Sequence, residues 1–382
     1  MKCKLEEICL FRMEKTNVAN LTTKTYISTE NMLPNKSGIV NATSLPTVNL
    51  TQAFENGDVL VSNIRPYFKK IWKARINGGC SNDVLVFVAK KDIDSDFLYY
   101  VLADDAFFAY AMATSKGTKM PRGDKKSIMQ YEVPCYDAET QQKIASILKS
   151  IDEKIELNNA INNNLLAQVQ LIFEAIYSCG DTAKMSDLIC EIESGSRPKG
   201  GAISQGIPSI GAEKIERFGI YDFSSEKYIS EEFFAKLKRG IVKSSDVLLY
   251  KDGAYTGKVS MALDGFPHEI CTVNEHVFII RTYCCRFQNY LYCCLSKKKI
   301  RDMVFALASS KAAQPGLNQN EVMGIEINLP DEDLLTSFED TVSPLMHLVA
   351  LNANENKRLS ELRDSLLPKL ISGELDVSDI EL

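Results

Sequence analysis

Residues 144–176 read IASILKSIDEKIELNNAINNNLLAQVQLIFEAI, and this stretch decides the fold because its apolar residues recur every 3.5 positions. Two sets of heptad positions carry the pattern: Ile144, Ile151, Asn158, Leu165 and Ile172, and then Leu148, Ile155, Asn162, Val169 and Ile176. A period of 3.5 predicts a helix that packs against another helix in a coiled coil, where a buried asparagine fixes the register at some cost in stability.

The same pattern recurs 194 residues later, in residues 338–370. Nine of its ten positions match the first copy in type: Phe338, Leu345, Asn352, Leu359 and Leu366, and then Val342, Val349, Asn356 and Leu370, with Arg363 as the exception. We therefore predict two copies of one unit whose helices pair with each other. In an antiparallel pair, the residues that face each other have numbers with a constant sum, here 514. Asn158 then faces Asn356 and Asn162 faces Asn352, so the side-chain amides can hydrogen-bond to one another. An unpaired buried amide would cost ~1–3 kcal/mol. Arg363 then faces Ile151, and we expect its stem to pack while its charged head reaches water.

Length and composition describe an ordinary globular protein of two or three domains, with 382 residues, 45% hydrophobic and 25% charged. No apolar run approaches the ~18 residues that span a bilayer, and residues 1–7 lack the apolar stretch of a signal peptide. Eleven cysteines without an export signal predict reduced thiols and a cytoplasmic location. The net charge of −6 does not indicate a nucleic-acid binder. It remains compatible with one, because local clusters decide contact and a basic partner could supply further charge.

The repeat extends beyond the helices. Lys4–Ile8 recurs as Lys184–Leu188, and Gly57–Val61 recurs as Ser245–Leu249. In each copy an apolar helical pattern (97–113 and 288–308) leads to a polar loop (115–119 and 310–314), a short strand (129–134 and 325–329) and an aspartate, Asp137 or Asp331, that can cap the long helix. These features predict an α+β fold with one helix in each globular unit. The predicted segments are a globular unit over 1–136, a helix over 137–179, a second globular unit over 180–331, a second helix over 332–372 and an acidic tail over 373–382. Pro344 either opens a fresh helix after Ser343 or kinks a continuous one.

Motifs for catalysis or metal binding are weak. Gly253–Val259 resembles a phosphate loop, but it is one residue short and has Val259 where Ser or Thr would hold magnesium, so a turn between strands is the better interpretation. Two cysteine doublets, at 284–285 and 293–294, lack the Cys-x-x-Cys hook of a zinc site and are interpreted as buried thiols. The three histidines have no nucleophile or carboxylate partner nearby in sequence, although a triad could assemble in space. We therefore predict no catalytic site, no metal and no cofactor.

Basic clusters interleaved with glycine, proline and aromatic residues suit phosphate contact. The loop over 116–126 has a net charge of +4 and should present its cations without a helix, and a second group surrounds Tyr67, Phe68 and Trp72. The candidate DNA-binding residues are Arg65, Lys69, Lys70, Lys116, Lys119, Arg122, Lys125, Arg197, Lys199, Lys251 and Lys258, with Lys73, Arg75, Lys126 and Lys297–Lys299 in the same clusters. A solvated charged face explains any single cluster equally well. Because both copies carry such a loop, binding is favoured. Thirty helical residues span ~45 Å, somewhat more than one turn of duplex DNA at ~34 Å, so two domains could reach separate half-sites.

The layout and motifs resemble the specificity subunit of type I restriction–modification systems, along essentially the whole chain. Residues 362–375, LRDSLLPKLISGEL, look like the terminal signature of that family. Residues 57–67, GDVLVSNIRPY, residues 246–258, DVLLYKDGAYTGK, and residues 206–210, GIPSI, are similar to segments of its target-recognition domains.

This resemblance implies two pseudo-repeated target-recognition domains separated by two long helices in an antiparallel coiled coil. Each domain would read half of a bipartite sequence in double-stranded DNA. The helices would act as spacer and as docking surface for two methyltransferase subunits, which bind S-adenosylmethionine and methylate adenine, and motor–nuclease subunits could join. The chain itself would not be catalytic. Two alternatives are the specificity protein of a fused restriction–methylation enzyme and a coiled-coil scaffold that does not bind DNA.

Overall fold

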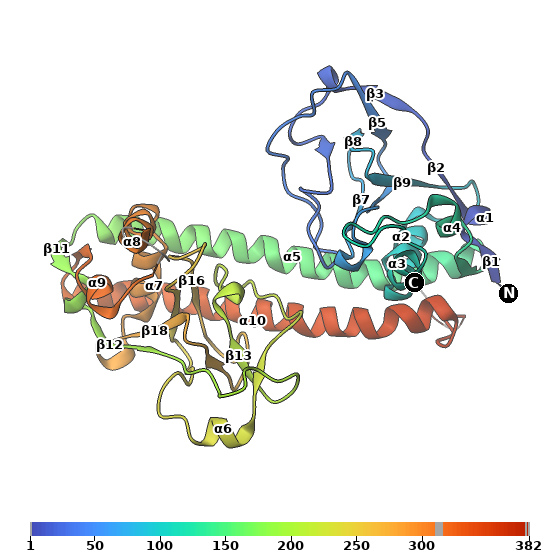
Figure 1. The fold of residues 1–382 in the computed structure, drawn as a ribbon. Helices are drawn as coiled ribbons and strands as arrows, with labels where there is room; N and C mark the ends of the chain where they lie inside the picture. Colours follow the sequence, from blue (N-terminus) through green and yellow to red (C-terminus); the bar gives the residue numbers. More distant parts are fainter. Residues whose placement is uncertain (1, 310–315, 379, 381–382) are drawn as a thin grey trace. The chain divides into compact units, whose positions relative to one another are not determined.

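The computed structural model describes residues 2–309, 316–378 and 380, and the chain divides into two compact units (Figure 1). Unit 1 comprises Met1–Glu153 and Leu359–Leu382, and unit 2 comprises Lys154–Arg358. Each unit therefore combines a globular part with portions of both long helices, whereas the segments predicted from the sequence follow the helix boundaries. Within the described ranges, no helix combines the length and hydropathy that crossing a membrane requires.

Unit 1 contains two four-stranded sheets and one two-stranded ladder. The first sheet, in spatial order, is β2 (Cys9–Phe11), β9 (Val84–Ala89), β6 (Val59–Ser62) and β7 (Ile71–Lys73), all antiparallel. The second is β3 (Lys15–Asn17), β5 (Leu50–Phe54), β8 (Gly78–Cys80) and β4 (Tyr26–Ile27), with β4 and β8 parallel. The ladder joins β1 (Lys2–Lys4) to β10 (Glu132–Pro134).

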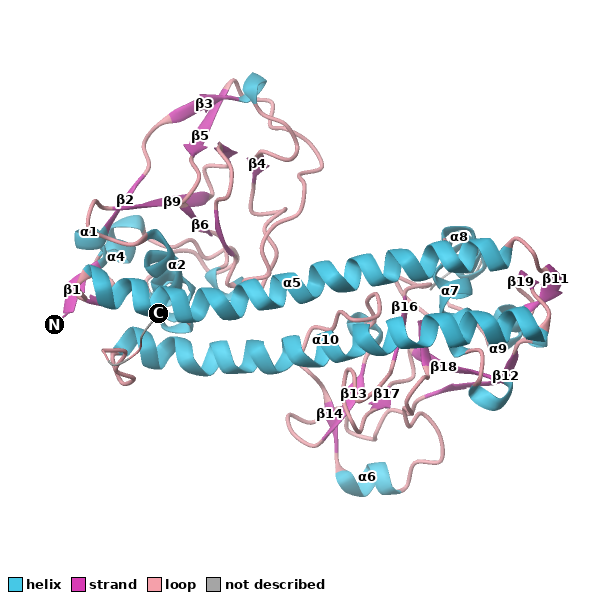
Figure 2. Cartoon of the chain, turned by 180° about the vertical axis from the view of Figure 1, so that it is seen from behind, coloured by secondary structure: helices cyan, strands magenta, loops and turns pink. Residues whose placement is uncertain are grey.

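Unit 2 repeats this plan with fewer strands. Its main sheet is β12 (Ile189–Ser194), β18 (Val277–Thr282), β15 (Val247–Tyr250) and β16 (Val259–Met261), again antiparallel. A smaller sheet holds β14 (Tyr228–Ile229), β13 (Ile207–Ile210) and β17 (Thr272–Val273), with β13 and β17 parallel. The ladder is β11 (Asp181–Lys184) with β19 (Glu326–Leu329). Figure 2 shows the strands of each unit in magenta.

The central strands of both main sheets are buried on two faces, which explains their continuous apolar runs. In β6, Val59 and Val61 join the core shared with the helices, whereas Leu60 joins a separate core on the other face. In β15, Val247 and Leu249 likewise face one core and Leu248 the other. The two-residue period of the strand therefore divides each unit into two hydrophobic layers.

The helical region predicted in each globular unit is broken into two helices, which corrects the expectation of one. Unit 1 has α2 (Ser95–Ala103) and α3 (Asp105–Ala113), and unit 2 has α7 (Gln288–Ser296) and α8 (Lys298–Ser309). Asp104 causes the first break, because its extended backbone ends α2 while its carboxylate caps α3 through Ala106 N–H at 3.1 Å. Short helices complete the two units: α1 (Leu5–Ile8), α4 (Lys125–Met129), α6 (Glu231–Ala235) and α9 (Gln319–Met323).

The two long helices are α5 (Ala138–Tyr177) and α10 (Glu332–Ser372). The predicted aspartate caps are confirmed, since Asp137 accepts from Thr140 N–H and Asp331 accepts from Leu334 N–H, both at 2.8 Å. Helix α10 runs through Pro344 without a break, so the alternative of a fresh helix at that proline is wrong.

The structure places the heptad asparagines against one another within unit 2. Asn158 donates to Asn356 and Asn352 donates to Asn162, each at 2.9 Å, so the contacting residue numbers rise along α5 as they fall along α10. The amides do not satisfy each other fully, because Asn158 also donates to Glu355 and its Oδ1 has no partner in the described structure.

Within unit 1, Arg363 departs from the expectation that its head would reach water. Its side chain is mostly buried, and its guanidinium contacts Asp152 on α5 at 2.9 Å. The hydroxyl of Tyr100 on α2 donates to the second oxygen of the same carboxylate, also at 2.9 Å. Arg363, which interrupts the apolar heptad pattern, thus takes part in a polar contact that joins α10, α5 and α2 within unit 1.

Candidate nucleic-acid interface

The basic loop of unit 1 is held in shape by a short backbone bridge. Lys116 and Arg122 exchange N–H···O bonds of 2.8 and 2.9 Å, which places Lys119 at the exposed end between them. Lys116 contacts Asp124 at 2.5 Å and Arg122 contacts Asp83 at 3.0 Å. Neither ion pair is buried enough to hold its cation strongly, because exposed pairs contribute only ~0–1 kcal/mol. These cations remain available to an external phosphate.

Two cations of this cluster lie on a helix, contrary to the expectation of a loop without one. Lys125 and Lys126 open α4, whose N-terminus is capped by Asp124 through the N–H groups of Lys126 and Ser127 at 3.1 and 3.0 Å. Both lysines are exposed, and the ammonium of Lys125 lies 5.8 Å from the ring of Phe11.

The second candidate group in unit 1 occupies the turn between β6 and β7. It is joined to the basic loop, because Arg65 N–H donates to the carbonyl of Pro121 at 2.8 Å. The Nε atom of Arg65 is buried and has no partner in the described part of the chain. The turn therefore brings Arg65 beside the loop that carries Lys119.

The lysines of this turn are tied to partners within the unit. Lys69 and Lys36 both contact Asp105, at 2.6 and 2.8 Å, and these hydrogen bonds lower the pKa of Asp105 although burial acts to raise it. Lys70 donates to the carbonyl of Thr29 at 2.6 Å, and burial lowers the pKa of its ammonium. Lys73 contacts Asp96 on α2. These partners could not be identified from sequence, because they lie 23 to 41 residues away.

The candidate cations of unit 2 are more dispersed. Arg197 is exposed and lies 3.7 Å from Glu275, and Lys199 is exposed two residues later. Lys251 packs over the ring of Phe278 at 5.1 Å, and Lys258 forms an ion pair with Glu216. The loop expected to correspond to the basic loop of unit 1, residues 310–314, lies outside the described residues.

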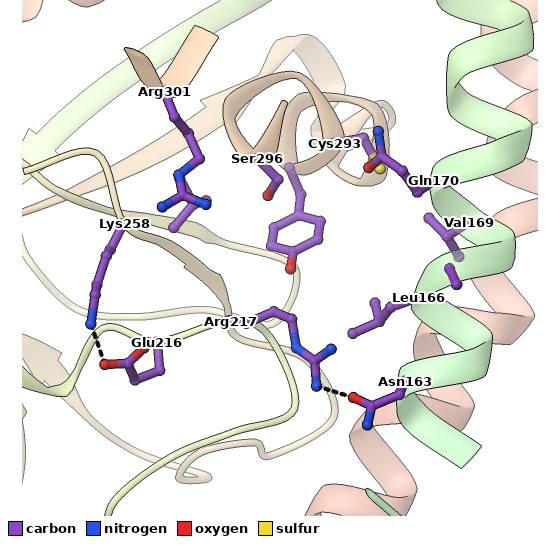
Figure 3. Close-up of a pocket in the computed structure, with 13 residues that line it drawn as sticks. Asn163, Leu166, Val169, Gln170, Glu216, Arg217, Lys258, Cys293, Ser296 and Arg301 are labelled. Atoms are coloured by element: carbon purple, nitrogen blue, oxygen red, sulfur yellow. Dashed lines mark hydrogen bonds and ion pairs between the residues drawn. The ribbon is translucent and has the colours of Figure 1, made fainter. Parts of the chain in front are cut away.

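Lys258 also lines a cavity of about 430 Å³ that the sequence did not predict (Figure 3). Leu166 and Val169 of α5 and Tyr292 of α7 supply apolar walls, and Arg217 and Arg301 add two further cations. Arg217 donates to Asn163 of α5 at 2.6 Å, as Figure 3 shows.

Asp58 and Asp246, which occupy equivalent positions in the two copies, are buried, and each contacts an arginine whose side chain is mostly shielded from water. Arg12 contacts Asp58 and Arg281 contacts Asp246, both at 2.6 Å. Because these arginines are enclosed with their carboxylates, we interpret both pairs as structural. The recurrence of the aspartate at an offset of 188 was the sequence signal for this shared feature.

The structure also tests the weaker motifs. Residues 251–258 form the turn between the paired strands β15 and β16, as interpreted from the sequence. Each histidine has a carboxylate partner that is distant in sequence: His268 with Glu226, His276 with Asp252 and His347 with Asp264. His276 also lies 3.5 Å from the adjacent Glu275, so the expectation of no nearby carboxylate partner is wrong for this histidine. Burial lowers the pKa of His268 despite its partner.

The cysteine doublets differ from the expectation in one respect. Cys293 and Cys294 are buried, and burial raises the pKa of both thiols, but Cys285 is exposed. No cluster of three potential metal ligands occurs among the residues that the structure describes.

Comparisons with known proteins match this chain to specificity subunits of type I restriction enzymes. Residues 1–167 match the family model of the type I restriction modification DNA specificity domain. The chain is 24% identical over 318 residues to the type I restriction enzyme MjaIX specificity subunit of Methanocaldococcus jannaschii, covering 77% of this chain and 72% of that protein. It is 24% identical over 431 residues to the type I restriction enzyme HindI specificity subunit of Haemophilus influenzae, covering 92% and 94%.

A solved structure shares the fold. The type I restriction-modification system S subunit from M. genitalium is 15% identical and matches with a TM-score of 0.59, covering 97% of this chain and 96% of that one. The predicted resemblance to type I specificity subunits is confirmed by these matches, and the mixed α and β fold agrees with the fold of that subunit.

Proposed function

We propose that this chain, whose residues 1–167 match a type I DNA specificity domain, is the DNA sequence-recognition subunit of a type I restriction–modification complex. The observation that carries the proposal is the duplication of one architecture. Each unit has an antiparallel sheet with the same strand order and a pair of helices beside that sheet. Each unit also has lysine or arginine in the turn between two strands of the sheet, β6 and β7 or β15 and β16. Two similar domains on one chain suit a target that has two separate half-sites.

In this proposal the two globular parts are target-recognition domains that read a bipartite sequence in double-stranded DNA. The cations that remain exposed would supply the phosphate contacts: Lys119, Lys125, Lys126, Arg197 and Lys199, with Lys116 and Arg122 released from weak surface pairs. Lys70 and Lys258 are engaged within their own units, and they would contribute to the shape of the site more than to phosphate binding.

Helices α5 and α10 would form an antiparallel coiled coil, with the asparagine pairs setting its register. Their outward positions carry exposed leucines, namely Leu157 and Leu171 on α5 and Leu348, Leu351 and Leu362 on α10. Exposed leucines at this density favour a protein-binding surface. The partners proposed for it are two methyltransferase subunits that bind S-adenosylmethionine, with motor–nuclease subunits as further members, and the chain itself would carry no catalysis.

The experiment that tests the proposal expresses this chain with an adjacent methyltransferase gene in a host without DNA methylation. Adenine methylation is then mapped by long-read sequencing. A bipartite motif that appears only when this chain is present would support the proposal and give the target. If both proteins associate and no motif appears, the recognition role is wrong and a scaffold that binds protein alone becomes the better explanation.

A further inference from the structure

The turn between β6 and β7 in unit 1 corresponds to the turn between β15 and β16 in unit 2. Residues 58–71 and 246–259 align without a gap at an offset of 188. Five residues are identical at matching positions. Val59 and Leu60 of the strand match Val247 and Leu248, and Asp58, Tyr67 and Lys70 match Asp246, Tyr255 and Lys258. The register of the strand pairs agrees, since Val61 faces Ile71 in unit 1 and Leu249 faces Val259 in unit 2. The tyrosine therefore lies at one defined place in both copies.

The two turns also have positive φ at the same two positions. The residues two before and two after each tyrosine have positive φ: Arg65 at 51° and Lys69 at 49° in unit 1, and Gly253 at 133° and Gly257 at 96° in unit 2. For a residue other than glycine such a conformation is costly, and it persists only where the surroundings or the function require it. Unit 1 keeps positive φ at these positions with an arginine and a lysine.

Each turn is fixed to the loop that follows the helix pair. Ile64 forms an isolated bridge with Arg122, and the equivalent Asp252 forms one with Gly316. In addition, Leu317 N–H donates to Lys251 O at 2.8 Å, where in unit 1 Gly123 N–H donates to Asn63 O at 3.2 Å. The turn is thus attached to the loop whose unit 1 copy carries the exposed cations.

The tyrosines themselves are exposed, Tyr67 by 50% and Tyr255 by 63%. Tyr283 is the one other tyrosine of comparable exposure in the described ranges. Each turn ring has one close neighbour. The ring of Phe68 lies 4.6 Å from that of Tyr67, and the ammonium of Lys258 lies 4.7 Å from the ring of Tyr255. A large aromatic ring that a turn exposes to water beside cations is suited to an anionic partner that also offers apolar edges.

We propose that Tyr67 and Tyr255 contact the bases of the two half-sites, one tyrosine for each unit. The ring packs against the edge of a base and its deoxyribose, and the methyl group of thymine is the chemistry that it matches best. This inference rests on the proposed function and adds to it the residues that read sequence, whereas the cations nearby bind phosphate without reading it. The ring, and not the hydroxyl, is the contacting group.

The test uses the full chain with its methyltransferase partner and duplexes that carry the mapped target. Tyr67→Ala is expected to weaken binding to the target about tenfold and to reduce discrimination at one half-site only, and Tyr255→Ala to do so at the other. Tyr67→Phe and Tyr255→Phe should bind like the wild type, because they keep the ring. Tyr283→Ala is the matched control and should leave binding unchanged.

A second measurement needs no variant. Hydroxyl-radical footprinting of the wild-type complex should show Tyr67 and Tyr255 protected by the target duplex and Tyr283 unprotected. Unchanged affinity of both alanine variants, or unprotected turn tyrosines in a complex that binds its target, would overturn the inference and leave the proposed function standing. Loss of the methyltransferase partner from the alanine variants would also overturn it, as the turns would then bind protein. A wild-type complex without sequence preference would instead remove the proposed function itself.

Discussion

Glu339 is a buried carboxylate that joins the long helix α10 to the start of α7 within unit 2. Its two oxygens accept from the backbone N–H of Tyr290 at 2.9 Å and from the amide of Asn289 at 2.7 Å. Burial raises the pKa of Glu339 to about 7, although these hydrogen bonds act in the opposite direction. In unit 1 the neutral Gln141 of α5 has the corresponding role, since its oxygen accepts from Asp94 N–H at 2.9 Å, next to α2.

Glu339→Gln should flatten the pH dependence of stability. The folded pKa of about 7 lies above the ordinary value of 4.5, so the folded state holds the proton more tightly and loses stability as pH rises from about 4.5 through 7. That interval corresponds to about 3 kcal/mol at most. Urea unfolding at pH 5 and pH 8, with hydrogen exchange of the Tyr290 amide, should show the difference in the wild type and little of it in the variant.

The exposed Glu361 on the same helix provides the control for this prediction. Glu361→Gln removes one carboxylate from α10 without touching α7, and it should keep the pH slope of the wild type. Equal slopes in the wild type and Glu339→Gln would show that Glu339 is already ionised throughout this range, and that the hydrogen bonds outweigh its burial.

The positive φ values of the two corresponding turns predict different stability costs for substitution in unit 1 and in unit 2. Gly257→Ala should destabilise unit 2 by about 1–2 kcal/mol, because alanine is strained at a φ of 96°. The added Cβ would also lie 3.3 Å from Val304. Lys69→Ala at the equivalent position should cost less than about 1 kcal/mol, since the strain is already present and only a partly exposed ion pair with Asp105 is removed. Thermal unfolding of the two variants tests the comparison, which fails if both cost the same.

The asparagine contacts of α5 and α10 are suited to a double-mutant cycle. Asn162→Leu removes the acceptor of the buried Asn352 amide and should cost about 1–3 kcal/mol, because a buried donor is left unpaired. Asn352→Leu should have a similar cost. The double variant should recover much of the stability, since two leucines suit the heptad positions. Urea unfolding of the four proteins measures the coupling, and additive costs would show that the two amides do not depend on each other.

The elements that the sequence predicted well depend on local chemistry. The long helices, their caps at Asp137 and Asp331 and the buried strands at 59–62 and 247–250 follow from period and neighbouring residues. The break at Asp104 was missed, because its apolar flanks continue the helical pattern while its capping role is visible only in the backbone. The partners of Lys69 and Lys258 were missed because Asp105 and Glu216 approach them through the fold, 36 and 42 residues away.

For the whole molecule, the contrast between charge and proposed function has a physical explanation. The chain carries 44 lysines and arginines against 50 aspartates and glutamates, and the structure shows that much of the positive charge in the candidate sites is already neutralised by neighbouring carboxylates. Long-range attraction to DNA would therefore be weak for this chain alone. The methyltransferase subunits would then have to supply part of the phosphate contact. The assembled complex should therefore bind DNA more tightly than this chain does alone.

The basic loop of unit 1 provides the corresponding test of phosphate binding in the assembled complex. Changing Lys116, Lys119 and Arg122 together to alanine should weaken binding to all DNA sequences and reduce the slope of log affinity against log salt, by about 0.9 for each phosphate that the loop no longer neutralises. Lys116 and Arg122 already pair with Asp124 and Asp83, so the slope should fall by less than the full value for three phosphates. Lys119→Ala alone should account for the largest share of this fall in slope. Lys2→Ala, which removes an exposed lysine paired with Glu132 on the terminal ladder, should leave the slope unchanged. A triple variant that keeps the slope of the wild type would place this loop outside the DNA interface.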